Sequence, residues 1–172
     1  LKKYPDLLIA TVGDDACRIL ETFQHQRLIH LSGKTTIRDM LIMSKMVNLV
    51  VCPDTGLLHA AGCFTTPKIG LLGHCTREHI TKHFDNDYSL ESGAACAPCY
   101  HLIVQGDVQC SIDPRTRATW CMMFGWKPMD LFNHICEVIE REYYGNRRTD
   151  YDGEIIILST GYGEPRSRIT VG

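Results

Sequence analysis

Residues 49–62 read LVVCPDTGLLHAAG, an apolar run that ends in a polar turn and continues into small and apolar residues. Residues 48–52 are predicted to form a buried strand, because an apolar run of this length between turn signals is typical of one. Asp54 or Thr55 is expected to cap a helix that follows directly. The small residues 60–62 keep that helix thin enough to pack closely on a sheet. A strand that leads into a helix in this way is the repeating unit of an α/β fold.

The same alternation extends to both sides of this stretch. Short apolar runs recur at residues 7–12, 28–31, 48–52 and 68–72, and the segments between them have helical spacing. The clearest helix is Ile37–Val47, whose apolar stripe is expected to be Ile37, Met40, Leu41, Met43 and Met46. Nearly continuous apolar strands that alternate with helices indicate a parallel sheet covered on both faces. The sequence therefore predicts a doubly wound, Rossmann-like α/β fold.

The second half of the chain is less regular. Residues 74–127 carry turn formers, charges and several cysteines without clear periodicity, which predicts an excursion from the sheet. A last helix is expected to begin at Pro128 and to end at Gly145, with its apolar residues buried. These are Leu131, Phe132, Ile135, Val138 and Ile139. We therefore expect a domain over residues 1–145 that includes a cysteine-rich insertion at 94–123. Residues 146–172 form a tail of open role, in which Glu154–Leu158 could be a strand.

Composition excludes several classes of protein. The 172 residues carry 18 basic and 20 acidic side chains, so the net charge of −2 gives no overall attraction to nucleic acid. No apolar run approaches the roughly 18 residues that cross a bilayer. The chain begins with Leu1 and no signal-peptide pattern follows, which suggests a piece of a longer protein. Nine cysteines outside any disulfide-framework pattern favour a reducing compartment, so we expect the cytoplasm, with a peripheral inner-membrane position left open.

Ligands of open α/β sheets bind where the parallel strands end. Four such ends carry polar or glycine residues, although ordinary loops have the same composition. They are 13–15, which includes Asp14 and Asp15, 32–36, which includes Lys34 and Thr35, 53–56, and 73–74. Gly33-Lys34-Thr35 lacks the upstream glycine of a Walker A loop, and no strand leads into Gly-x-Gly-x-x-Gly. The sequence thus supports neither a P-loop NTPase nor a dehydrogenase.

The third of these ends is the most informative. Asp54 and Thr55 offer oxygen atoms at the helix start, Gly56 lets a ligand approach the backbone closely, and His59 lies on the first turn. A hydroxyl, a glycine and a histidine at a helix start suit a diphosphate. The alternative is that His59 is an ordinary core or capping histidine.

The cysteines form two groups. Cys96, Cys99, Cys110 and Cys121 have the spacing of a four-sulfur metal site, with zinc or iron as the metals favoured by thiolate ligands. Four protein ligands would leave no open position, so that metal would be structural, and His101 could replace one sulfur. Buried unliganded thiols or a disulfide are the alternatives. Cys17, Cys52, Cys63 and Cys136 are expected to be small core residues.

The stretch from Leu49 to Ala61, followed by Pro67 and the run 68–72, resembles the signature of the heptosyltransferase family of GT-B glycosyltransferases. The family form is a strand, Asp-(Ser/Thr)-Gly-x-x-His-x-Ala-Ala, a small turn, a proline and a strand. The resemblance covers roughly residues 7–140. The cysteine pattern that begins at Cys96 is also similar to an iron-binding finger in members that modify autotransporter proteins.

The resemblance implies that this chain is the donor-binding half of an inverting enzyme, inactive without an N-terminal GT-B domain that supplies the base. Asp54, Thr55, Gly56 and His59 would hold the diphosphate and sugar of the donor. Lys34 and Thr35 would line the nucleotide pocket, and Asp14 and Asp15 would lie near the ribose. The donor is expected to be a nucleotide-diphospho-sugar, with an ADP-linked heptose-like sugar favoured, and the acceptor a lipopolysaccharide-type glycan or a protein. No metal is needed for transfer, and an oligomer is possible.

The sequence departs from the family at residues 72–75, Leu-Gly-His-Cys, where Phe-Gly-Pro-Thr is usual. The family's first strand of this domain also has no counterpart before Leu1. These departures keep a second hypothesis open, in which the chain is a non-catalytic, metal-stabilised binding or assembly module.

Overall fold

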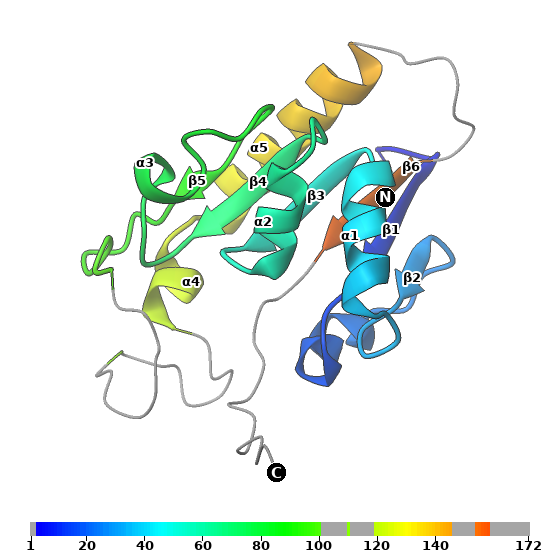
Figure 1. Ribbon diagram of the computed structural model, residues 1–172, viewed down its shortest axis with the longest axis horizontal. Helices are drawn as coiled ribbons and strands as arrows, with labels where there is room; N and C mark the ends of the chain where they lie inside the picture. Colours follow the sequence, from blue (N-terminus) through cyan, green and yellow to red (C-terminus); the bar gives the residue numbers. More distant parts are fainter. Residues whose placement is uncertain (1–2, 101–109, 111–118, 146–153, 159–172) are drawn as a thin grey trace.

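Six parallel strands form one sheet in the order β2-β1-β6-β3-β4-β5 (Figure 1). The computed structural model describes residues 3–100, 110, 119–145 and 154–158. The strands are β1 (Leu7–Thr11), β2 (Leu28–His30), β3 (Leu49–Pro53), β4 (Lys68–Leu72), β5 (Leu90–Glu91) and β6 (Glu154–Leu158). The doubly wound α/β class predicted from the alternating pattern is confirmed.

Helices connect most of the strands. They are a 3-10 helix at Asp15–Thr22, α1 (Ile37–Met46), α2 (Gly56–Gly62), α3 (Arg77–Ile80), α4 (Trp120–Phe124) and α5 (Pro128–Ile139), which continues as a π-helix over Glu140–Tyr144. Thr36 and Asp39 form a capping box at the start of α1, and Pro128 occupies the first turn of α5. In the described part of the chain, no helix is both long enough and apolar enough to cross a membrane.

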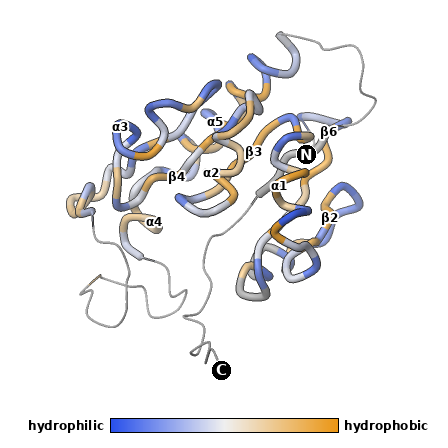
Figure 2. The backbone as a smooth tube through the Cα atoms, in the orientation of Figure 1, coloured by the Kyte–Doolittle hydropathy of each residue, from blue (hydrophilic) through white to orange (hydrophobic). Residues whose placement is uncertain are grey.

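Two hydrophobic cores lie on opposite faces of the sheet. Along β3, Val50 and Cys52 belong to the core beneath α1 and α2, whereas Leu49 and Val51 belong to the core beneath α5. This division follows from the alternation of side chains along a strand. Figure 2 shows β3 as hydrophobic, in contrast to the hydrophilic segment around α3. Because both faces are covered, the edge formed by the strand ends remains as a place for polar side chains to gather.

The last strand in the sequence lies inside the sheet. β6 pairs with β1, with Leu7 opposite Glu154, and with β3, with Leu49 opposite Ile156. It thereby joins the pair β2-β1 to the group β3-β4-β5. The folded domain thus extends to Leu158, past the boundary at residue 145 that the sequence suggested.

Helix α1 is turned relative to the expected orientation. Ile37 is 76% exposed, and Leu41 and Met46 are also exposed, whereas Ser44 is fully buried. Met40 and Met43 pack against the core together with Val47. Met40 and Met43 therefore face the core as predicted, whereas the prediction was wrong for Ile37, Leu41 and Met46. The helix is apolar on more than one side, so its period alone could not choose the buried face.

Two further burial predictions were wrong. Phe132 is 54% exposed, and the buried face of α5 is formed by Cys136, Val138 and Ile139, with Ile135 packed against them. Cys63 is exposed, whereas Cys17, Cys52 and Cys136 are buried as predicted. Cys63 follows directly after α2, where the chain has already left the core face.

Candidate functional site

The junction between β3 and α2 holds a carboxylate and an imidazole together. Asp54 follows the end of β3, and the first turn of α2 brings His59 back to it, so that Nε2 of His59 lies 2.9 Å from Oδ1 of Asp54. A carboxylate only accepts hydrogen bonds, so Nε2 carries the proton and Nδ1 is left for another partner. The Asp54 side chain is 14% exposed and that of His59 is 53% exposed. The pair is therefore anchored in the protein and open to a ligand.

The start of α2 is open on its outer side. Thr55 is the N-cap residue, as the sequence suggested, but its hydroxyl donates to the Pro53 carbonyl, 3.3 Å away, and makes no capping bond to α2. No atom lies within 4 Å of where a Cβ on Gly56 would be. The first turn of α2 therefore has no side-chain cap, and the space beside Gly56 is open.

The turn after β4 brings two more side chains to Asp54, which the sequence motif had not placed in the site. Nε2 of His74 lies 3.7 Å from Oδ2 of Asp54, and the Cys75 thiol donates to the same oxygen over 3.5 Å. Burial, with a further contribution from the Asp54 charge, raises the pKa of the Cys75 thiol to about 12. The sequence signal that could have found them is a histidine next to a cysteine soon after the apolar run of β4, because both residue types bind metals.

The loops after β1 and β2 form a second group on the same edge of the sheet. The Gly33 N–H donates to the Gly13 carbonyl at 2.8 Å, and φ is +71° at Gly33, a conformation that glycine adopts without strain. Nζ of Lys34 donates to the His30 carbonyl at 2.8 Å. Because β6 lies between β1 and β3, β1 is two strand spacings, about 10 Å, from β3, and β2 is three spacings, about 14 Å, from it.

The remaining predicted donor-site residues belong to this second group. Thr35 is partly buried and adjoins Lys34, and Asp14 is exposed after β1, where the Cys17 thiol lies 3.5 Å from its carboxylate. The side chain of Asp15 lies outside the described residues. The edge of the sheet thus carries both sets of predicted residues, in two separate groups.

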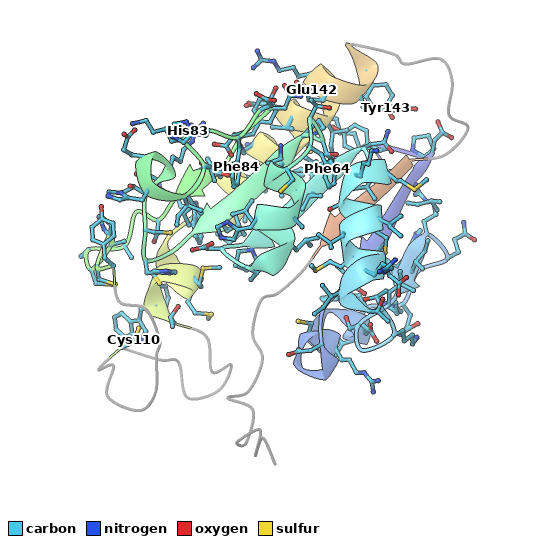
Figure 3. All side chains as sticks on the ribbon, in the orientation of Figure 1. Phe64, His83, Phe84, Cys110, Glu142 and Tyr143 are labelled. Carbon is cyan, nitrogen blue, oxygen red and sulfur yellow. The ribbon has the colours of Figure 1, made fainter. Side chains whose placement is uncertain are left out.

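The predicted metal-binding cysteines lie near one another. The pKa of the Cys110 thiol is raised by burial and by the neighbouring thiols of Cys121, Cys96 and Cys99. Cys110 is labelled in Figure 3, and Cys121 packs beneath Gly73. Within the described residues, Asp54, His74 and Cys75 are the one set of three or more such side chains whose ligand atoms all lie within 4.8 Å of one another. The four-sulfur site stays a prediction, and His101 lies outside the described residues.

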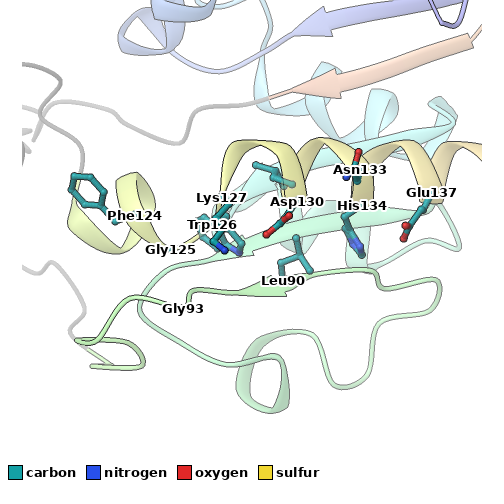
Figure 4. A pocket seen from close by; sticks show the side chains of 11 residues that line it. Leu90, Gly93, Phe124, Gly125, Trp126, Lys127, Asp130, Asn133, His134 and Glu137 are labelled. Carbon is teal, nitrogen blue, oxygen red and sulfur yellow. The ribbon is translucent and has the colours of Figure 1, made fainter.

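A separate hollow of about 690 Å³ lies between β5 and α5 (Figure 4). Its wall includes Trp126, Lys127, Asp130 and His134, and none of the predicted donor-site residues belongs to it. Nε2 of His134 lies 2.8 Å from the Tyr88 carbonyl, which fixes that ring against the sheet.

The fold and the edge groups define a doubly wound α/β domain with its polar site at the carboxyl ends of the strands. The model of glycosyltransferase family 9, the heptosyltransferases, matches residues 11–104, which is more than half of the chain. The chain belongs to this family, as the motif from Asp54 to His59 predicted, and it carries a glycosyltransferase domain that implies a nucleotide-sugar donor and an acceptor. Comparisons with curated proteins and with solved structures gave no match.

Proposed function

We propose that this chain is the donor-binding half of an inverting glycosyltransferase. The observation that carries the proposal is the Asp54–His59 pair beside the uncapped start of α2, within a family 9 domain. Charged phosphate oxygens need donors, and this place offers free backbone N–H groups and an imidazole.

His59 contributes an imidazole at the place where a diphosphate would lie. Asp54 accepts a hydrogen bond from Nε2 of His59 and so orients the ring beside the start of α2. Thr55 and Gly56 provide a hydroxyl and an open backbone at the same place. These groups stabilise the negative charge that develops on the leaving diphosphate, and in this proposal transfer needs no metal.

The nucleotide extends from this place toward the loops after β1 and β2. Lys34 and Thr35 line its pocket, and Asp14 and Asp15 lie near the ribose. Lys34 is solvent exposed and its ammonium bonds to the backbone carbonyl of the preceding strand, so its long side chain is able to turn toward a phosphate.

The finer assignments follow from the family resemblance. The donor is an ADP-linked, heptose-like sugar, and the acceptor is a lipopolysaccharide-type glycan or a protein. The base that deprotonates the acceptor belongs to an N-terminal GT-B domain, so the donor-binding half is inactive by itself. Cys96, Cys99, Cys110 and Cys121 hold a structural zinc or iron ion, for which elemental analysis of wild-type protein and of Cys110→Ser is the test.

Calorimetric titration with ADP, UDP and GDP, in the presence of a chelator, tests the donor site. ADP is expected to bind, and His59→Ala is expected to weaken binding by about 1–3 kcal/mol, the contribution of a charged hydrogen bond. His83→Ala is the matched control, because His83 is exposed after α3 and away from the motif. The proposal fails if no nucleotide binds at millimolar concentration, or if His59→Ala binds ADP as tightly as His83→Ala does.

A further inference from the structure

Three different ligand types converge at the ends of β3 and β4. Oδ2 of Asp54 lies 3.5 Å from Sγ of Cys75 and 3.7 Å from Nε2 of His74, and each of the three residues offers one ligand atom within 4.8 Å of the other two. Zinc bonds of about 2.3 Å to sulfur and about 2.0 Å to nitrogen or oxygen place tetrahedral ligand atoms about 3.3–3.6 Å apart. The observed separations are close to the edges of such a tetrahedron.

We propose that Asp54, His74 and Cys75 form a transition-metal site for a zinc-like divalent ion. A mixed set of one carboxylate oxygen, one imidazole nitrogen and one sulfur suits zinc, cobalt(II) or iron(II) rather than magnesium or calcium. Three protein ligands leave the fourth position of a tetrahedron for water or another small ligand.

The surroundings hold each ligand in place. The second oxygen of Asp54 accepts the hydrogen bond from His59, which orients the carboxylate in the way that a second shell around a metal does. The backbone carbonyl of His74 accepts a hydrogen bond of 2.8 Å from the Tyr100 N–H, which ties the turn to the following excursion. Cys75 is 5% exposed and packs in the core with Val12 and Leu72. Asp54 and Cys75 are therefore held in place through their side chains, and His74 is held through its backbone.

This site stands on its own geometry and does not rest on the proposed donor binding. The two meet at Asp54, which uses Oδ2 for the metal and Oδ1 for His59. The site also differs from the four cysteines near Cys110, because it has only one sulfur.

Cobalt(II) titration of the full chain, prepared under reducing conditions with chelator and then freed of chelator, tests the proposal. In the Cys96→Ser/Cys99→Ser variant, which lacks two ligands of the proposed four-cysteine site, one cobalt ion is expected to give tetrahedral visible absorption and a thiolate charge-transfer band. His74→Ala and Cys75→Ser are each expected to weaken that binding at least about 100-fold, because each removes a direct ligand. His59→Gln is expected to weaken it about 10-fold, the effect typical of an orienting group.

The controls separate this site from the rest of the chain. His79→Ala removes a nearby exposed histidine, and Cys63→Ser removes an exposed thiol beside α2, so both are expected to bind cobalt as the wild type does. Circular dichroism shows whether each variant is folded, and X-ray absorption of the zinc-loaded Cys96→Ser/Cys99→Ser variant gives the ligands of this site.

The site is supported if X-ray absorption shows a zinc ion bound by one sulfur atom and otherwise by nitrogen and oxygen atoms. The proposal is overturned if the folded Cys96→Ser/Cys99→Ser variant binds no cobalt, or if His74→Ala and Cys75→Ser, made in that background and folded, bind it unchanged. Titration of His74→Ala with ADP distinguishes the two proposals. If this variant loses metal binding but still binds ADP, the metal site is separate from the donor site.

Discussion

The two halves of the strand-end edge hold their polar side chains in different ways. In the half formed by β3 and β4, three side chains, one from α2 and two from the turn after β4, converge on a single carboxylate, that of Asp54. In the half formed by β1 and β2, the loops are joined through the backbones of Gly13 and Gly33, and Lys34 bonds to its own strand. Polar loops at strand ends thus form a site only where adjacent strands and a helix turn direct their side chains to one point.

Removal of β6 is expected to have the largest effect on this comparison. Truncation after Gly145 leaves β1 and β3 without the strand that joins them, so we expect loss of the cooperative unfolding transition, whose total free energy is about 5–15 kcal/mol in such domains. Hydrogen exchange is expected to show the β1–β2 half losing more protection than the half packed on α5. Truncation after Leu158 is the control, and equal stability of the two truncated proteins would contradict the role of β6.

A buried lysine at the start of β4 and an exposed lysine in the loop after β2 are expected to differ next in their effect on stability. Lys68 is fully buried, and its ammonium donates to the carbonyls of Phe64 and Asp85 at 3.0 and 2.5 Å. Lys68→Met leaves both carbonyls without this donor and is expected to lower the free energy of unfolding by about 2–4 kcal/mol. Lys34→Met, on the exposed loop of the other half, is expected to change it by less than about 0.5 kcal/mol. Urea denaturation measures both, and similar losses would show that burial of Lys68 is unimportant.

The same lysine gives a pH dependence. Burial lowers the pKa of Lys68, so the unfolded chain binds that proton more tightly than the folded chain. The wild type therefore gains stability from this group as pH rises from the lowered pKa toward the ordinary lysine value, and Lys68→Met is expected to lack that gain. The difference between the two proteins is the measurement, because other groups titrate in the same range.

Substitution of the two glycines of α2 is expected to affect different properties, stability at Gly62 and ligand binding at Gly56. A Cβ on Gly62 would lie 2.5 Å from ring carbons of Phe84, so Gly62→Ala is expected to destabilise the protein by about 1–2 kcal/mol. A Cβ on Gly56 would meet nothing within 4 Å, so Gly56→Ala is expected to change stability by less than about 0.5 kcal/mol and yet weaken ADP binding. Thermal denaturation and ADP titration of both variants check this, and an unstable Gly56→Ala would show that the space is not free.

The helix caps give the smallest expected difference. Thr36 accepts a hydrogen bond from the Asp39 N–H, so Thr36→Ala is expected to lower the free energy of unfolding by about 1 kcal/mol. Thr55→Ala loses no capping bond, so its free energy of unfolding is expected to stay within about 0.5 kcal/mol of the wild type. Urea denaturation of both variants measures the difference.

The hydrogen bonds from Thr36 also lower the pKa of Asp39. The stability from this carboxylate is present above its ordinary pKa and is lost as pH falls through the lowered value. The check is to measure the free energy of unfolding of the wild type and of Thr36→Ala as the pH is lowered. If both proteins lose the same stability over that range, the capping box does not contribute as proposed.

The part of the candidate site that sequence could predict is the part built locally. Asp54 and His59 meet because a strand runs into a helix and the first turn spans the few residues between them. His74 and Cys75 reach the same carboxylate only because β4 pairs with β3. That pairing brings together residues about twenty positions apart, and no local pattern states which loops become neighbours.

Sequence by itself determined the alternating elements, the class of the fold and the motif from Asp54 to His59, since apolar periodicity and capping act over a few residues. Tertiary structure alone decided the buried side of α1, the central position of β6 and the gathering of His74 and Cys75 at Asp54. These depend on which segments pack against each other. Helix α1 is apolar on several sides and β6 could pair at several edges, so neither position follows from local sequence. Both are decided by the rest of the sheet, because apolar surface is buried only where a partner surface exists.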